Sequence, residues 1–446
     1  MRRVVLVAGL AAAFAFGALV AVLTPARPGS DLARASDRPA AEAVGGSMSS
    51  PTSSTASPSG ASATNAASPP VGLSTGLPSV LDRTGTRERL QAALDAGRVE
   101  LAAPGVAASV LIANGQQWTG TAGVADLASG RPLTPSTPFA VASISKTFLA
   151  AEILALVEEG TLTLEAHVAP LLPGVRVSSR PIDPRITVRQ LLDHTSGLRD
   201  YLVDPRLDRA VLADPTRRWT VAQALAYAGR PAAAPGVRYF YANTNYALLG
   251  LLAERVTGRT LAAEYRARFF GPLGLASAFY QDVEAPTAEL PTAYRYTAWA
   301  LDAVPIDVTD GTAIRPFTAL TTAAGPAGSV AASPADLVRW VRALYAGTVL
   351  APATVQAMVD DAATTAALKS GAAYGLGVQV LTINGQLSYG HSGRLVGAQS
   401  VVRWFPDSGI AIAVTTNESR FDPVIILRDL LAIVSPQVFG AGYRPV

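Results

Sequence analysis

Two lysines occur in the 446 residues of this chain, and one of them, Lys146, stands three positions after Ser143. An arginine cannot release its proton in a protein, whereas a lysine removed from water can act as a base. Residues three apart share one face of a helix, so Ser143-Ile144-Ser145-Lys146 predicts a nucleophile beside its base. If Ser143 opens the helix, its hydroxyl lies at the positive end of the dipole, and attack on a carbonyl gives an acyl-enzyme. The alternative is a surface serine and lysine on an ordinary helix.

A second candidate element is Tyr241-Ala242-Asn243, about a hundred residues later. A tyrosine near a cationic lysine loses its proton more easily and can pass it to a leaving group. The amide of Asn243 can orient a substrate carbonyl and hold the lysine. The neighbouring Tyr239 and Tyr246 are interpreted as aromatic core residues at a helix start.

A third element is His391-Ser392-Gly393, which we expect between two strands. A glycine there lets a ligand approach a strand edge closely. The backbone N–H of Arg394, together with that of Ser143, would form an oxyanion hole. The side chain of Arg394 is a candidate partner for a substrate carboxylate, with a solvent-facing strand arginine as the alternative. His167 and His194 are interpreted as structural, and Lys369 is given no role.

The elements that must position these residues follow from the hydrophobic periodicity. Helices are expected over Thr84–Glu100, Thr147–Glu159, Thr187–Asp193, Val221–Ala228, Asn245–Thr257, Leu261–Phe270, Ser333–Gly347 and Pro423–Val434. Strands are expected over Gly105–Ala113, Gln116–Ala122, Gly375–Ile383, Gln386–Gly390, Ser400–Phe405 and Ile410–Thr416. Strands at both ends with helices between them predict an α/β (α+β) fold. One antiparallel sheet is built from both ends of the chain and flanked by helices, with a mostly helical lobe inserted in the middle.

The N-terminal region predicts export. Arg2 and Arg3 precede an apolar run from Val4 to Leu23, which indicates a signal peptide or a signal-anchor over 1–26. Residues 27–80 form a Ser/Ala/Pro-rich segment that we expect to be a disordered linker. The domain then covers 81–446, with its sheet part at about 81–142 and 325–436 and its helical lobe at about 143–324. The expected location is extracellular, associated with the cell wall, or anchored on the outer face of the cytoplasmic membrane.

Composition narrows the class of protein. A hydrophobic content of 49% indicates a substantial core, and a net charge of +3 without a basic run argues against nucleic acid as a partner. The absence of cysteine excludes disulfides and lipoprotein attachment. No metal or cofactor is expected, and the oligomeric state is not indicated.

The three motifs, in this order and at these spacings, resemble the serine β-lactamase-like family, which includes class C β-lactamases, D-alanyl-D-alanine carboxypeptidases and related esterases. The flanking stretches "LLDHTSGL", "YANTNYALLGLLAERVTG" and "YGLGV" fit as well, and the resemblance covers about 90–435. It implies Ser143 as nucleophile, Lys146 as base, Tyr241 as proton shuttle, Asn243 as substrate contact, and His391 and Gly393 at the strand edge of the site.

One departure shapes the expected activity. Class C β-lactamases usually carry lysine where this chain has His391, and histidine is more similar to the carboxypeptidase and broader serine-hydrolase branches. We therefore expect an exported serine hydrolase that cleaves D-alanyl-D-alanine peptides of the cell wall. The alternatives are an esterase or β-lactamase of the same fold, or a non-catalytic binding or scaffold protein. The corresponding partners are peptide or small-molecule substrates, namely D-alanyl peptides, β-lactams or esters.

Overall fold

The computed structural model describes residues 79–296, 298 and 303–435, which belong to one compact unit. The predicted signal segment and nearly all of the predicted linker lie outside these residues. Within the described residues, no helix combines the length and the apolar character needed to cross a bilayer.

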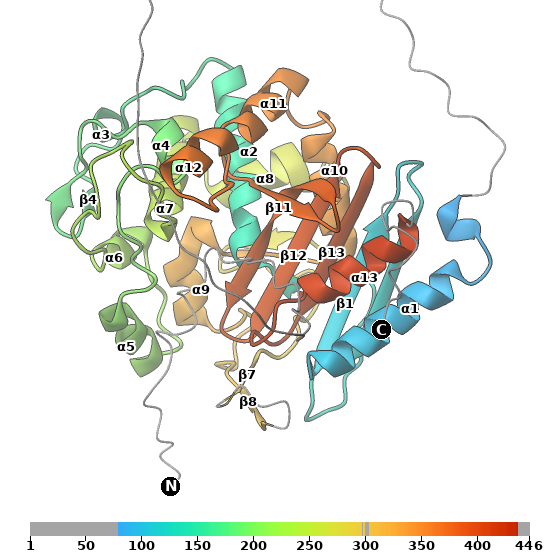
Figure 1. The fold of residues 1–446 in the computed structure, drawn as a ribbon. Coiled ribbons are helices and arrows are strands. Elements are labelled where there is room, and N and C mark those ends of the chain that lie inside the picture. Colours follow the sequence, from blue (N-terminus) through green and yellow to red (C-terminus); the bar gives the residue numbers. More distant parts are fainter. Residues whose placement is uncertain (1–78, 297, 299–302, 436–446) are drawn as a thin grey trace, which may run out of the picture. The chain divides into compact units, whose positions relative to one another are not determined.

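A six-stranded antiparallel sheet joins the two ends of the described chain (Figure 1), with the strand order β10-β11-β12-β13-β1-β2. Its strands are β1 (Gly105–Leu111), β2 (Gln117–Gly123), β10 (Gln379–Ile383), β11 (Gln386–Leu395), β12 (Ala398–Phe405) and β13 (Ile410–Thr416). The pairing of β1 with β13 sets Val106 opposite Thr416. The predicted antiparallel sheet built from both ends of the chain is therefore confirmed.

Helices cover both faces of this sheet, and this explains why its central strands are buried and mostly apolar. Figure 1 shows α1 (Thr86–Glu100) and α13 (Val424–Val434), in blue and red, over one face, where Val414 and Ile412 join their core cluster. On the other face, α2 (Ser145–Glu158) and α10 (Pro334–Tyr345) pack in a second cluster. Strands β1 and β13 are buried at every residue, as expected for strands covered on both sides.

Helices are the main regular elements of the segment between β2 and β10, as predicted. Besides α2 and α10, its helices are α3 (Val168–Leu171), α4 (Val188–Leu192), α5 (Pro205–Ala213), α6 (Val221–Leu225), α7 (Asn243–Thr257), α8 (Leu261–Tyr265), α9 (Thr318–Ala324), α11 (Pro352–Asp360) and α12 (Ala362–Leu368). The helix predicted over Leu261–Phe270 changes at Arg266 into one π-helical turn, Arg266–Phe270. Helices α3, α5, α9, α11 and α12 were not predicted.

Short strand pairs complete the inserted segment. A three-stranded sheet has the order β3-β9-β6, from β3 (Phe139–Ala140), β6 (Phe279–Tyr280) and β9 (Val330–Ala332). Two further pairs are β4 (Arg176–Val177) with β5 (Arg180–Pro181), and β7 (Tyr294–Tyr296) with β8 (Pro305–Asp307). Because β3 leads directly into the turn that carries Ser143, its pairing with β9 fixes the start of that turn.

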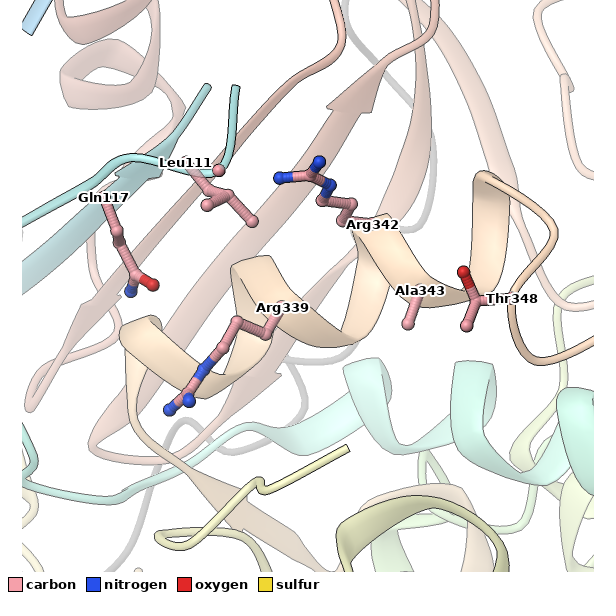
Figure 2. A pocket seen from close by; sticks show the side chains of 7 residues that line it. Leu111, Gln117, Arg339, Arg342, Ala343 and Thr348 are labelled. Carbon is pink, nitrogen blue, oxygen red and sulfur yellow. The ribbon is translucent and has the colours of Figure 1, made fainter. Parts of the chain in front are cut away.

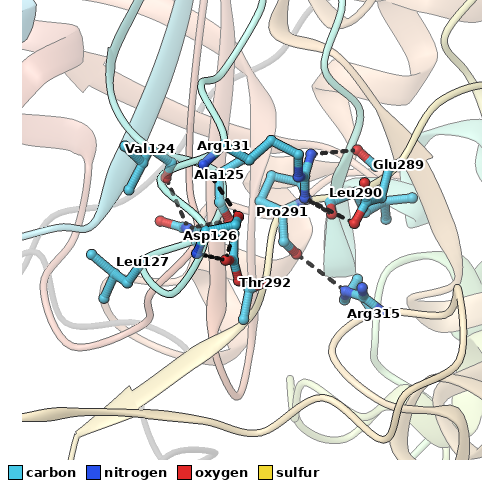
Figure 3. Close-up of polar contacts among 12 residues, drawn as sticks. Val124, Ala125, Asp126, Leu127, Arg131, Glu289, Leu290, Pro291, Thr292 and Arg315 are labelled. Carbon is cyan, nitrogen blue, oxygen red and sulfur yellow. Dashed lines mark hydrogen bonds and ion pairs between the residues drawn. The ribbon is translucent and has the colours of Figure 1, made fainter.

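A polar network fastens the loop after β2 to the segment before β7 (Figure 3). Arg131 pairs with Glu289 at 3.3 Å and donates to the carbonyl oxygen of Leu290 at 2.9 Å. The hydroxyl of Thr292 donates to Asp126 at 2.6 Å, and this bond is the main reason why the pKa of Asp126 lies well below its usual value. The network links the inserted segment to the edge of the large sheet.

Candidate active site

Ser143 lies in a tight turn immediately before α2. The turn is the 3₁₀ element η2 (Ala142–Ile144), and α2 begins at Ser145. The helix expected from Thr147 thus begins two residues earlier, and Ser143 lies in the 3₁₀ turn before it and does not open the α-helix itself. Ala142 has a φ of 49°, a left-handed conformation that costs energy for a residue other than glycine. This bend leaves Ser143 partly exposed between buried neighbours, as a nucleophile requires.

Lys146 is completely buried beside this serine. Its Nζ lies 3.1 Å from Ser143 Oγ, 2.7 Å from Asn243 Oδ1 and 2.8 Å from the carbonyl oxygen of Ala327. Burial lowers the pKa of Lys146 to about 7, although the Asp200 carboxylate acts in the opposite direction. A neutral amine has two N–H donors and one lone pair. The two pure acceptors, Asn243 Oδ1 and the Ala327 carbonyl, match the donors, so the lone pair is left for the proton of Ser143.

Asp200 is a member of this network that the sequence analysis missed. The Asn243 Nδ2 donates to Asp200 Oδ2 at 2.8 Å, which orients the other end of the amide toward Lys146. Asp200 is buried, and burial raises its pKa, whereas the backbone N–H of Leu202 lowers it. No spacing rule could have paired Asp200 with Asn243, because Asp200 lies in the loop between α4 and α5, whereas Asn243 begins α7. Of the two expected roles of Asn243, the structure shows the contact with the lysine.

Tyr241 lies over the same lysine, with its ring centroid 5.2 Å from Lys146 Nζ. Removal from water raises the pKa of Tyr241 above its usual value, and a hydrogen bond with Ser143 opposes this only in part. The expectation of a more acidic tyrosine is therefore wrong, because the low dielectric that makes Lys146 a base also disfavours a phenolate. Tyr241 is placed to donate a proton.

Gly393 lies where β11 passes the turn of the nucleophile. A Cβ at this position would fall 2.1 Å from the carbonyl oxygen of Val141 and 3.0 Å from the backbone nitrogen of Ser143. The glycine is thus required by the approach of the chain's own backbone, and not, as expected, only by that of a ligand. The motif also lies inside β11 and not between two strands, because residues 391–395 continue to pair with β12.

His391 is held in a neutral form by two contacts. Its Nδ1 lies 2.6 Å from the carbonyl oxygen of Ser392 and must therefore carry the ring proton. The other nitrogen, Nε2, lies 2.9 Å from the hydroxyl of Tyr374, which then donates to it. Burial lowers the pKa of His391 to about 3. Both ring nitrogens are hydrogen-bonded, so His391 and Tyr374 form an uncharged boundary of the site beside β11.

The backbone and the side chain of Arg394 point in different directions. The N–H of Ser392 donates to Gln379 Oε1 at 3.1 Å, so it points to the edge of β11 that faces β10. Backbone N–H groups two residues apart in a strand point to the same edge, so the N–H of Arg394 also points to this edge. Side chains alternate between faces, which sets that of Arg394 on the face opposite Gly393. Glu418 and Asp422 act on its guanidinium there. This arrangement favours an oxyanion role for the backbone and not a substrate contact for the side chain.

Two residues without an assigned role lie close to the site. The ring centroid of His194 is 4.2 Å from that of Tyr241. Lys369 is exposed, and its Nζ lies 5.8 Å from the centroid of Tyr239. His167 remains apart, at the beginning of α3.

A separate hollow lies between α10 and the β1–β2 hairpin and contains none of the residues above. Figure 2 shows Arg339 and Arg342 projecting from α10 beside it. Arg342 donates to the carbonyl oxygen of Ala113 at 3.0 Å, and Arg339 pairs with Asp336. Both arginines are thus used within the chain, which leaves the Ser143 region as the candidate active site.

Comparisons with known proteins show what the chain is similar to. A family model described as Beta-lactamase matches residues 90–434. Penicillin-binding protein 4 of Amycolatopsis lactamdurans is 29% identical over 374 residues, which cover 80% of this chain and 93% of that protein. Esterase EstB of Burkholderia gladioli is 29% identical over 376 residues, which cover 78% of this chain and 96% of the esterase.

Two further relatives carry names that refer to D-stereochemistry. A D-aminopeptidase of Cereibacter sphaeroides is 34% identical over 205 residues, 46% of this chain, and this match spans only 38% of that enzyme. A crystal structure of a D-stereospecific amidohydrolase from Streptomyces sp. superposes with a TM-score of 0.65 at 28% identity, over 79% of this chain and 99% of that one.

Proposed function

The chain belongs to the β-lactamase family of serine hydrolases, and from this premise we propose that Ser143 forms an acyl-enzyme during cleavage of D-alanyl peptides of the cell wall. One observation carries the proposal. Ser143 Oγ lies 3.1 Å from the Nζ of a fully buried lysine whose pKa is lowered to about 7 by that burial. A nucleophile hydrogen-bonded to a base that is partly neutral at neutral pH fits acyl transfer.

In the proposed reaction, the proton transfers of acylation are reversed during deacylation. Lys146 accepts the proton of Ser143 as Oγ bonds to the substrate carbonyl carbon. The backbone N–H groups of Ser143 and Arg394 stabilise the resulting oxyanion. Tyr241 donates its proton to the leaving nitrogen as the C–N bond breaks, and it recovers a proton from Lys146. Water then attacks the ester of Ser143 by the same transfers in reverse, which releases the acid and restores the serine.

Terminal D-alanine is the leaving group that we propose. The similarity to a penicillin-binding protein, a D-aminopeptidase and a D-stereospecific amidohydrolase supports an acyl residue of D configuration. The test is release of D-alanine from a D-alanyl-D-alanine peptide, measured beside Ser143→Ala. We expect turnover that the substitution abolishes. Turnover that survives in Ser143→Ala contradicts the mechanism.

An esterase is the second candidate, and the similarity to EstB over most of both chains favours it. Hydrolysis of p-nitrophenyl acetate without release of D-alanine would support the esterase, and fast hydrolysis of nitrocefin would support a β-lactamase. If no substrate is turned over and no fluorescent penicillin labels the protein, a binding or scaffold role replaces catalysis.

Export of the protein is part of the same proposal. The apolar run from Val4 to Leu23 after two arginines supports it, since a cell-wall substrate lies outside the cytoplasmic membrane. Expression of the full chain in a bacterial host, followed by fractionation and N-terminal sequencing, distinguishes a cleaved signal from an anchor. Recovery of the intact chain from the cytosol would contradict export.

A further inference from the structure

His194 lies in the loop after α4 in an unusual backbone conformation. Its φ is 64°, in the left-handed region that non-glycine residues rarely adopt, and its side chain is completely buried. Such a conformation persists only where the surroundings determine it, and it is common near functional sites. The contacts of His194 show what this conformation achieves.

His194 holds the segment that carries Tyr241 at two points. Its carbonyl oxygen accepts from the N–H of Phe240 at 2.9 Å, and its Nδ1 accepts from the N–H of Ala242 at 3.2 Å. These donors are the backbone groups immediately before and after Tyr241. The segment belongs to no strand, and α7 begins only at Asn243, so these bonds do the work that a sheet partner would do. His194 therefore determines the backbone position of Tyr241.

The side chain of His194 also restrains the ring of Tyr241. The two ring centroids are 4.2 Å apart, and the rings of Tyr246 and Tyr374 lie 5.2 and 4.7 Å from the imidazole. Nδ1 accepts from Ala242 and also lies 2.9 Å from the side-chain nitrogen Nδ2 of Asn245 in α7. The proton of the neutral imidazole is therefore on Nε2, which has no hydrogen-bond partner among the residues that the structure describes. Burial and Lys146 both lower the pKa of His194. The imidazole is thus a neutral acceptor packed against the proposed acid.

We propose that His194 is a positioning residue that holds the Tyr241 hydroxyl for protonation of the leaving group, and that it thereby supports cleavage of amides more than of activated esters. This inference rests on the role of Tyr241 in the proposed function. An amine leaves only after protonation, whereas p-nitrophenolate leaves without a proton. Misplacement of Tyr241 should therefore slow amide cleavage selectively, since general acid catalysis contributes about 10²- to 10⁴-fold.

Three variants of His194 separate positioning from simple packing. His194→Asn keeps an acceptor at the place of Nδ1, and asparagine tolerates a positive φ. His194→Gln carries its acceptor one bond too far, at the place of Nε2. His194→Phe keeps an aromatic ring but has no acceptor. Each variant is compared by kcat/KM on a D-alanyl-D-alanine peptide and on a p-nitrophenyl ester with the same acyl group.

We expect the amide-to-ester ratio to fall by at least about tenfold in His194→Phe and His194→Gln, and to stay within a few-fold of the parent in His194→Asn. Equal losses on both substrates, or a normal ratio in His194→Gln, overturn the inference. His194→Gln decides the question if His194→Phe does not fold. Tyr241→Phe gives the reference: if its ratio is normal, the proposed acid itself is wrong, and if its ratio falls while that of His194→Gln does not, only the role of His194 fails.

Discussion

At the scale of single residues, removal from water shifts the pKa values of Lys146 and Tyr241 so that one side chain can act as a base and the other as an acid. Burial lowers the pKa of Lys146 to about 7 and raises that of Tyr241 above its usual value. One group can therefore accept a proton at neutral pH while the other keeps its own. Such a pair of environments assigns the base and the acid in many enzymes.

Acylation should depend on pH through Lys146. The amine must be neutral to accept a proton, so the acylation rate should rise with pH through about 7 and level off above it. Stopped-flow acylation by a p-nitrophenyl ester between pH 5 and 9 measures this. Lys146→Arg keeps the charge but cannot release a proton, so we expect a loss of about 10²- to 10⁴-fold. A flat profile together with near-normal activity of the arginine variant would refute the role of Lys146.

Replacement of Arg394 by alanine tests whether its side chain, and not only its backbone N–H, contacts the substrate. Because its side chain lies on the face of the sheet opposite Gly393 and near Glu418, Arg394→Ala should leave substrate preference unchanged. The measurement is the ratio of kcat/KM values for peptides ending in a free and in an amidated D-alanine. We expect this ratio to stay within about twofold, the scatter of surface substitutions. A selective loss on the free acid would restore the side chain as a carboxylate-binding group.

At the scale of elements, the hydrophobic patterns identified the strands of the large sheet and the helices that cover it, but they missed α9, although every residue of α9 is buried. The strands Gly105–Leu111 and Ile410–Thr416 are apolar runs with turn residues at their ends, and both were predicted. The strand Gln386–Leu395 was predicted only as far as Gly390, because the sequence that follows has small and polar residues. Its extension depends on pairing with β12, which no local pattern contains.

Substitution of Gly393 should impair the enzyme more than substitution of any other glycine near the site. In Gly393→Ala the added methyl group would press on the backbone of Val141 and Ser143, so the strand or the turn must move. We expect activity to fall by about 10²-fold or more, as for misplaced catalytic groups, and stability by about 1–3 kcal/mol. Activity assays and thermal unfolding measure the two effects.

Gly229→Ala is the matched control for this substitution. The new methyl group would meet only the flexible side chain of Arg199, at 3.0 Å, and the backbone of Gly229 has no positive φ. The Gly229→Ala variant should therefore retain the activity of the parent. Normal activity of Gly393→Ala would show that β11 and the nucleophile's turn are not as close as described.

At the scale of the molecule, the fold class could be predicted because strands at both ends enclose a helical segment. Of the candidate site, only the residues within the sequence motifs could be predicted. Ser143, Lys146, Tyr241 and Asn243 converge, and this could be inferred from a family pattern. Asp200 and His194, from the connection between α4 and α5, and Tyr374, from the segment before β10, also belong to the site. Their contacts depend on the tertiary fold and on no local spacing, although His194 and Tyr374 lie in stretches that fit the family.

The described region should act without the N-terminal segments. Leu81 and Val434 pack in the same core cluster, so a chain from Ser79 to Ser435 contains the core clusters of the described residues and every residue assigned to the site. We expect its kcat/KM to lie within about twofold of the full chain, because no catalytic group is lost. A chain that begins after Leu81 should unfold at a lower temperature. Loss of activity on removal of residues 1–78 would show that these residues contribute to the site.

The most direct test of the central claim is to locate the acyl group. The protein is mixed with a fluorescent penicillin or a p-nitrophenyl ester, quenched in acid, and analysed by intact mass and peptide mapping. We predict one acyl group per chain, on Ser143, absent from Ser143→Ala and formed far more slowly by Lys146→Arg. An acyl group on another residue, or undiminished turnover by Ser143→Ala, would contradict the account.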